Sequence, residues 1–385
     1  MNALDKLSPS DLQAALTQVS GSNNANAHRT MTDAGRAFGN ALSARLDQVR
    51  GGSNSVSELA SRDMTGFRVS AGSSMTYGFG GMSPAAFHAS NGESTEKTGL
   101  SGGDGGRDIS EKLSVWTRGI GVFSSNNGDG QHAGFDRTTA GGLAGGDLPI
   151  TPNFRVGAAV GFARSDVIGK DGNGNEAVDS YYVGLYSGWT PGKWFLDNNL
   201  GFSFNKVETK RALSFGLINR TATGTTNGYD VSLETKGGYR FTVNNYTLEP
   251  SLSLRYDLTD INSYTESGAD ALDLTVQGQK RNFLRSGLGG RIIRTFALDN
   301  GMVLEPELRV RWEHDILDAG TKTTQWIGDQ QFTATSAKAG RDAGVFGAGI
   351  AAIIDKDMRL YAHYDSEVRA NQIDHIVTAG FRYSW

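Results

Sequence analysis

Residues 246–258, YTLEPSLSLRYDL, alternate between apolar and polar side chains over their whole length. One set of alternate positions holds Tyr246, Leu248, Pro250, Leu252, Leu254, Tyr256 and Leu258, and the other holds Thr247, Glu249, Ser251, Ser253, Arg255 and Asp257. Because successive side chains of a strand point to opposite faces, this stretch predicts a strand with one apolar and one charged face. Residues 302–315 repeat the pattern.

The same alternation extends through residues 112–385, where two kinds of connection separate about twelve strands. Short turns rich in Pro, Asn, Asp and Gly begin at Thr151, Thr190, Thr242, Ala297 and Asp355. Longer polar connections cover residues 125–131, 169–176, 212–226, 265–270, 319–329 and 367–372. The two kinds alternate along the chain, which places the short turns at one end of the sheet. A soluble sandwich has no reason to sort its turns in this way, whereas outer-membrane barrels with an even strand number do. We therefore expect an all-β fold, a twelve-stranded antiparallel transmembrane β-barrel.

Three details refine this prediction. Aromatic side chains near the short turns, such as Trp189 and Trp194, indicate an interfacial girdle. Pro250 and Pro306 lie inside predicted strands and lack a backbone donor, so we expect bulges there. Residues 331–354 are predicted to form one long strand that is polar up to Asp342.

Composition excludes several classes of function. The chain has 385 residues and a net charge of −4, which gives no electrostatic argument for nucleic acid as a partner. Cysteine is absent, which excludes a disulfide framework and a thiol nucleophile within this chain. No apolar run reaches the roughly 20 residues of a membrane helix. The first residues lack the basic and apolar segments of a secretion signal, so we expect the chain to be the C-terminal part of a longer precursor.

Residues 1–50 are predicted to form two helices. Ser8 is a suitable N-cap, Pro9 suits the first helical position, and Gly21 is a plausible stop. The second helix should begin near Thr30 or Thr32 and end at Gly51 and Gly52. One face of it holds Met31, Ala34, Phe38, Leu42 and Leu46. Residues 51–111 are rich in Gly and Ser and are predicted to be a linker before the barrel of residues 112–385.

Motifs for catalysis or metal binding are weak. The six histidines have none of the spacings typical of a zinc site, and the sequence lacks a nucleophile elbow. We therefore expect no catalytic residue, no metal and no cofactor in this chain.

Several segments together resemble the translocator domains of autotransporters, the type V secretion family. The opening ALDKLSPSDLQAAL resembles the start of these domains, and AFGNALSARL resembles their pore helix. LSVWTRGIGVF (113–123) and NFRVGAAVGFARSDV (153–167) resemble the first and third strands. The end, AGFRYSW (379–385), resembles the signal for outer-membrane assembly, although it ends in Trp385 where Phe is more usual. The long segment 51–111 is another departure, since many members have it in much shorter form.

The resemblance implies a Gram-negative outer-membrane barrel that supports secretion and surface anchoring of its own upstream passenger. It implies two further partners, which are the outer-membrane lipid with lipopolysaccharide and the barrel assembly machinery. It also implies that the barrel is a monomer. It also implies that the N-terminal helix threads the lumen as a plug.

Three groups of site residues follow. The pore-helix residues are Met31, Arg36, Phe38, Leu42 and Arg45; the lumen-facing residues are Glu249, Arg255, Asp257, Arg285, Glu305, Glu307, Arg309 and Arg311; the assembly-signal residues are Phe381, Tyr383 and Trp385. We expect Arg36, Arg45 and Arg50 to pair with lumen acids such as Glu249, Glu305 and Glu307, and the sequence leaves open which pairs form.

Other readings remain open. The chain could belong to an enzyme-bearing autotransporter with its hydrolase domain upstream of residue 1, or could be a free-standing porin, which the N-terminal helices disfavour. Some relatives cleave themselves through an asparagine side chain, and Asn23 and Asn24 lie in a suitable region, but the flanking residues do not match.

Overall fold

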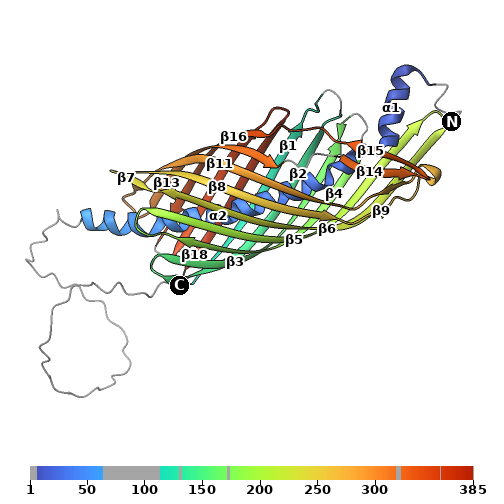
Figure 1. Ribbon diagram of the computed structural model, residues 1–385. Coiled ribbons are helices and arrows are strands. Elements are labelled where there is room, and N and C mark those ends of the chain that lie inside the picture. The colour runs from blue at the N-terminus through green and yellow to red at the C-terminus, as the bar shows by residue number, and fades with distance from the viewer. Residues whose placement is uncertain are drawn as a thin grey trace, which may run out of the picture.

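The computed structural model describes residues 7–63, 113–129, 132–170, 174–317, 322–355 and 357–384. Within these residues, twelve long antiparallel strands form a barrel with a helix running along its interior (Figure 1). The wall strands are β1 Ser114–Asn126, β2 Phe135–Thr151, β3 Phe154–Gly169, β4 Asn175–Trp189, β5 Trp194–Phe215, β6 Ile218–Tyr239, β8 Tyr246–Ile261, β11 Gln279–Arg294, β13 Val303–Leu317, β16 Asp342–Ile353, β17 Met358–Val368 and β18 Gln372–Ser384.

Pairing of the first and last wall strands closes the barrel. β1 and β18 are antiparallel along their full length, from Ser114 opposite Ser384 to Asn126 opposite Gln372. Each remaining wall strand pairs with its neighbours in chain order. The predicted fold class is therefore confirmed.

The two strand prolines are accommodated without bulges. β6 pairs Gly238 with Ser251, and the short β7 (Phe241–Val243) pairs Phe241 with Leu248. Both strands advance by the same number of residues between these two pairs, so no residue is inserted opposite Pro250. Pro306 of β13 has the same arrangement between β11 and the short β12 (Phe296–Ala297). The expected bulges were wrong: the ladder is interrupted where the proline lacks its N–H and resumes in the same register.

The N-terminal helices begin where their capping residues allow. α1 spans Pro9–Ser20, with the Ser8 hydroxyl accepting the Asp11 N–H at 3.2 Å, and ends at Gly21, whose φ is 54°. The short helix η1, Ser22–Ala25, follows. The expected cap and stop of the first helix therefore agree with the structure.

The second helix, α2, is longer than expected at both ends and spans Ala27–Asp63. Its first turn is already closed by the Thr30 N–H, which donates to the Asn26 carbonyl at 2.9 Å, so the predicted start at Thr30 or Thr32 was too late. The predicted stop at Gly51 and Gly52 was also wrong, because a glycine lowers helix stability by only about 1 kcal/mol and does not forbid the helix. Residues 64–112, which hold most of the predicted linker, lie outside the described residues.

The end of the barrel near the N-terminus carries structure that the sequence did not suggest. β5 and β6 continue as a hairpin through residues 212–226, predicted as a loop, and turn at Gly216 and Leu217. A second sheet lies beside it, with β9 Tyr264–Thr265, β10 Leu274–Val276, β14 Lys322–Ile327 and β15 Gln330–Thr335, and with the short helix η3 Asp270–Leu272 between β9 and β10. The predicted strand 331–354 is therefore two strands, β15 and β16, in different sheets.

α1 docks on the extended hairpin. Val19 packs against a buried cluster that includes Leu213 and Ala222. Arg211 Nη1 donates to the Gln18 carbonyl at 2.9 Å, and the Ser214 N–H donates to Gln18 Oε1 at 2.8 Å. The hairpin therefore holds the end of α1 by both apolar and polar contacts.

The two faces of the wall strands differ as the alternation predicts. Leu252 and Leu254 are 65% and 50% exposed on the outside, whereas Glu249 and Asp257 are 1% and 2% exposed on the inside. None of the described helices is both long and apolar enough to span a bilayer.

Replacing Leu254 with arginine tests the face assignment. Leu254→Arg would place a charge on the lipid face and should destabilise the barrel by ~2–4 kcal/mol if it lies near the midplane. Urea unfolding of the barrel in lipid vesicles measures this loss. Ser253→Arg is the control, because Ser253 lines the lumen; equal losses at both positions would contradict the assignment.

Candidate functional site

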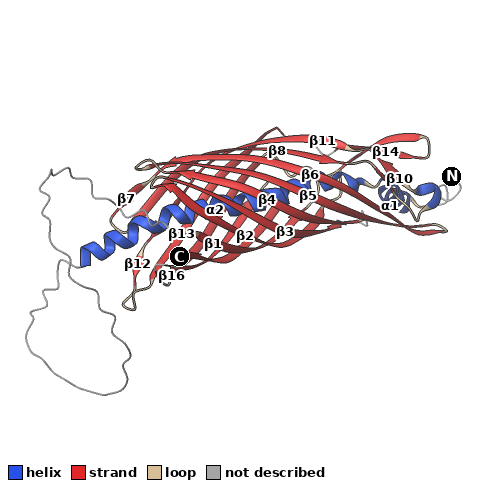
Figure 2. Cartoon of the chain, turned by 90° about the horizontal axis from the view of Figure 1, so that it is seen from below, coloured by secondary structure: helices blue, strands red, loops and turns tan. Residues whose placement is uncertain are grey.

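The lumen occupied by α2 is the candidate site. Figure 2 shows α2 running along the barrel interior, from the end near α1 to the end that carries β7 and β12. Side chains of residues 27–50 are mostly buried, and they meet different parts of the wall on different faces of the helix.

One face of α2 is apolar and packs against β1, β2 and β4. Phe38, Leu42 and Leu46 are at most 3% exposed, and their cluster includes wall residues such as Trp116 and Leu143. The Phe38 ring stacks on Tyr182 with centroids 4.7 Å apart and planes 17° apart. Stacked aromatic pairs of this kind add stability beyond the area that they bury.

Glycines in the wall make room for these side chains. A Cβ on Gly184 would lie 2.7 Å from Phe38 Cε1 and 2.9 Å from Leu42 Cδ1. A Cβ on Gly188 would lie 2.9 Å from Leu46 Cδ2. We call the surface formed by Gly184, Gly188 and Tyr182 the glycine seat.

Charged side chains on several sides of α2 pair with wall residues of opposite charge on several strands. Arg45 Nε lies 2.6 Å from Asp147 Oδ2 of β2, and both side chains are at most 1% exposed. Arg50 pairs with Asp197 of β5. Lys236 of β6 donates to Asp47 Oδ1 at 2.6 Å. Because an unpaired charge in such an enclosed place is costly, these pairs fix both the height and the rotation of the helix.

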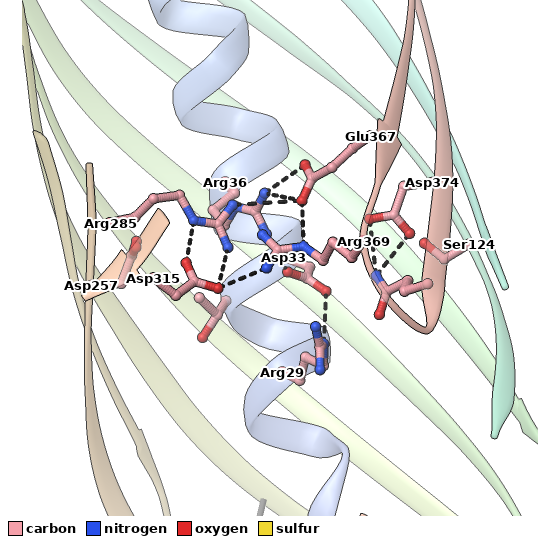
Figure 3. A network of polar contacts seen from close by, with 12 residues as sticks. Arg29, Asp33, Arg36, Ser124, Asp257, Arg285, Asp315, Glu367, Arg369 and Asp374 are labelled. Carbon is pink, nitrogen blue, oxygen red and sulfur yellow. Dashed lines mark hydrogen bonds and ion pairs between the residues drawn. The ribbon is translucent and has the colours of Figure 1, made fainter. Parts of the chain in front are cut away.

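A larger charge network surrounds the first half of α2 (Figure 3). Arg36 donates to Asp33 and to Glu367 of β17, each at 2.8 Å. Glu367 also accepts from Arg369 at 2.8 Å. Arg369 in turn donates to Asp315, at 2.8 Å. Carboxylates shared between arginines therefore link the helix to β13 and to the connection between β17 and β18.

The helix arginines pair with acids of the lumen, as expected, but mostly with acids other than the three named as examples. Arg36 binds Glu367, Arg45 binds Asp147 and Arg50 binds Asp197, although Arg50 also comes within 3.8 Å of Glu249. The expected acids are engaged by arginines of the wall instead: Glu249 and Glu307 by Arg291, and Glu305 by Arg359. Sequence reasoning missed Asp147, Asp197 and Glu367 as partners of the helix. The alternation of each strand could have shown that these side chains face the lumen, but it does not show which helix arginine lies opposite each of them.

The other predicted lumen residues point inward and pair along the wall. Arg255 donates to Asp257 at 2.6 Å. Arg285 binds Asp315 at 2.5 Å, and Arg309 binds Asp365. Arg311 binds Glu313 at 3.1 Å. Met31, the remaining predicted pore-helix residue, is fully buried and packs with Val178 and Val207.

A cavity of about 80 Å³ lies beside α2, away from the glycine seat. Small helix residues, Ala37, Ala41 and Ala44, face charged wall residues such as Arg118 and Arg311 across it. A cavity of this size and polarity can hold several waters. The helix therefore fills the lumen tightly on one side and leaves a wet space on the other.

The structure describes only some of the predicted assembly-signal and cleavage residues. Phe381 and Tyr383 of β18 are 42% and 44% exposed on the outer face, and Trp385 lies outside the described residues. Asn24 is buried and its amide donates to Gln325 Oε1 at 3.4 Å. The side chain of Asn23 also lies outside the described part. Within that part, no cluster of His, Asp and Glu suits a metal ion.

Substitution of Gly184 tests the seat. Gly184→Val would collide with Phe38 and Leu42, so we expect ~1–3 kcal/mol of destabilisation by overpacking and a higher pore conductance as the helix loosens. Planar-bilayer recordings and thermal melts measure both. Gly237→Val is the matched control, since its Cβ would meet its nearest neighbour at 3.6 Å; an unchanged conductance in Gly184→Val would contradict the seat.

Known proteins share this architecture. The profile of the family described as "Autotransporter beta-domain" matches residues 115–365. The Extracellular serine protease of Serratia marcescens is 25% identical over 271 residues, which are 70% of this chain and 26% of that protein. The chain thus spans about a quarter of the length of this curated relative.

Two solved structures share the fold. The translocator domain of the autotransporter NalP from Neisseria meningitidis superposes with a TM-score of 0.58 at 18% identity, covering 71% of this chain and 88% of that one. The β domain of the Bordetella autotransporter BrkA superposes with a TM-score of 0.54 at 22% identity, covering 71% of this chain and all of that one.

Proposed function

The chain belongs to the autotransporter β-domain family, the outer-membrane translocator barrels of Gram-negative bacteria, and we propose that α2 is the plug and tether left in this barrel after secretion of an upstream passenger. The observation that carries this proposal is the buried pairing of helix charges with the wall, above all Arg45 with Asp147. A segment merely passing through the lumen would have no reason for such matched partners on separate strands.

The proposed orientation follows from the two ends of the barrel. The short turns lie at the end where α2 leaves the lumen, and we assign this end to the periplasm. The hairpin of β5 and β6 then projects from the cell surface together with α1. The passenger would continue outward from the N-terminal side of α1.

Two rows of side chains on the outer face match those expected at the boundary of the lipid. Phe162, Tyr181 and Phe204 lie opposite one another across β3, β4 and β5. Two residues nearer the cell surface on each of these strands, the next row on the same face consists of Arg164, Asp179 and Lys206. We assign the aromatic row to the membrane interface and the charged row to contact with lipopolysaccharide head groups.

The passenger defines the activity of the whole protein. The Serratia relative is named as a protease, which favours a hydrolase passenger as the second candidate. For the barrel itself we propose no catalytic role, because most of the charged lumen residues described above pair with one another or with α2. Closure of β1 on β18 supports a barrel that is complete as a monomer.

Removal of the plug tests the proposed function. Deleting residues 1–50 should raise single-channel conductance sharply in planar bilayers, because the polar lumen would then be open from end to end. Heat-modifiable migration on gels is the control that the shortened barrel has folded. Equal conductance of the folded full and shortened chains would rule out a plug.

We also propose that the last strand is read by the barrel assembly machinery. Val377, Phe381 and Tyr383 alternate with polar residues along β18, and before closure this strand has an unpaired edge. An assembly factor can pair with such an edge by strand addition, and the aromatic side chains would then fix the register.

Truncation separates an assembly signal from simple interfacial anchoring. Deleting residues 383–385 should block membrane insertion in cells, while the same variant still folds, less stably, in detergent. Protease protection and heat-modifiable migration measure insertion and folding. Insertion in cells at the normal rate would leave these aromatics as interfacial anchors alone.

A further inference from the structure

Wall arginines bind the main chain of α2 near the end of the barrel with the short turns. Arg240 lies between β6 and β7, Arg291 lies on β11, and Arg359 lies on β17. Each donates a guanidinium N–H to a helix carbonyl: Arg240 to Arg50 at 2.5 Å, Arg291 to Asp47 at 2.9 Å and Arg359 to Gln48 at 2.8 Å. We call these three arginines the carbonyl collar.

Acids of the wall hold the collar in place independently of the helix. Glu249 accepts from Arg240 Nε through Oε1 and from Arg291 Nε through Oε2, each at 2.7 Å. Arg359 donates to Glu305 through Nη2. A guanidinium has several N–H donors in a fixed planar arrangement. When some of them bind an acid of the wall, others remain free to donate toward the lumen axis.

Residue 48 shows that the collar recognises main chain rather than side chains. The side chain of Gln48 is buried, and neither its amide nitrogen nor its amide oxygen has a hydrogen bond. Its carbonyl nevertheless accepts from Arg359. A different side chain at this position would leave that contact intact.

The bound carbonyls lie at the last turn before a weak point of the helix. At 3.6 residues per turn, carbonyls 47, 48 and 50 span about 160° of the helix circumference, so the collar grips the helix from several sides. Gly51 and Gly52 follow, and each is roughly 1 kcal/mol less favourable in a helix than alanine. If the helix unwinds from Gly51, the carbonyls of residues 47, 48 and 50 lose the N–H groups that they bind one turn further along the helix. Each of these carbonyls then still accepts a hydrogen bond from an arginine of the collar.

We propose that the carbonyl collar is a binding site for main chain, which holds the last lumen turn of the threaded segment in place. Its ligand is a helical main chain of any sequence, whereas the charge pairs and the glycine seat set the register of this particular helix. The inference rests on the proposed plug and adds the device that holds its last lumen turn.

Hydrogen exchange of the full-length chain, read by mass spectrometry over residues 44–54, tests the collar. The collar variant combines Arg240→Gln, Arg291→Gln and Arg359→Gln with Glu249→Gln, Glu305→Gln and Glu307→Gln, so that the acids bound to the collar are not left as unpaired charges. Amides in this window should exchange roughly tenfold faster, since hydrogen bonds from charged donors are lost. Peptides over residues 31–42, held by the glycine seat, should keep their protection.

Two controls decide what the result means. Arg309→Gln with Asp365→Asn removes a wall pair that belongs to the same lumen but not to the collar, and should leave the window unchanged. Gln48→Ala removes the side chain and keeps the carbonyl, and should change exchange by less than about twofold. Arg359→Gln with Glu305→Gln is the milder variant if the full collar variant does not fold, and should show a smaller acceleration.

The collar is wrong if the folded collar variants exchange like the parent chain, if the Arg309 control accelerates equally, or if Gln48→Ala accelerates as much as the collar variant. These outcomes are independent of the plug, which is judged by the conductance of the chain without residues 1–50. A plug without a collar would give low conductance with unchanged exchange in the collar variant.

Discussion

The charges that α2 carries into the lumen have to be neutralised there, and this constraint sets the position of the helix. An arginine as enclosed as Arg45, which is fully buried, would be strongly destabilising without its carboxylate. Its partner, Asp147, lies on β2, whereas the partners of Arg36 and Arg50 lie on β17 and β5. Contacts on separate sectors of the wall leave the helix one height and one rotation that satisfy all of them.

The glycine seat and the charge pairs restrict the position of the helix in different ways. The seat is a shape match, in which missing Cβ atoms at Gly184 and Gly188 admit Phe38, Leu42 and Leu46. The charge pairs are directional and join α2 to acids on several sides of the wall, including β2 beside the seat. Since the side chains beside the wet cavity are small, the helix is pressed to one side of the lumen rather than centred in it.

Sequence reasoning predicted several features that depend on local periodicity or capping. The faces of β8 follow from alternation at Leu252, Leu254 and Glu249, and the ends of α1 follow from Ser8 and Gly21. The twelve strands could be counted because short turns alternate with longer connections along the chain.

What could not be predicted depends on long-range geometry. Which acid faces Arg45 is set by the stagger of the closed barrel, and no local pattern records that stagger. Residues 212–226 look like a loop because outward positions such as Thr221 and Thr223 are polar, as expected of strands that rise clear of the hydrocarbon. Gly51 and Gly52 suggest a helix end by propensity alone, yet the structure continues α2 through them.

The hairpin that holds α1 has a mechanical consequence. A pull on the chain at Ser8 would load α1 first, and its contacts through Gln18 to Arg211 and Ser214 would pass the tension into the paired strands β5 and β6. Those strands are bonded along their length and would bear the load in shear, which many hydrogen bonds resist together. Drag on a surface-exposed passenger would thus be carried by the rigid wall, and α2 with its buried ion pairs would be shielded from it.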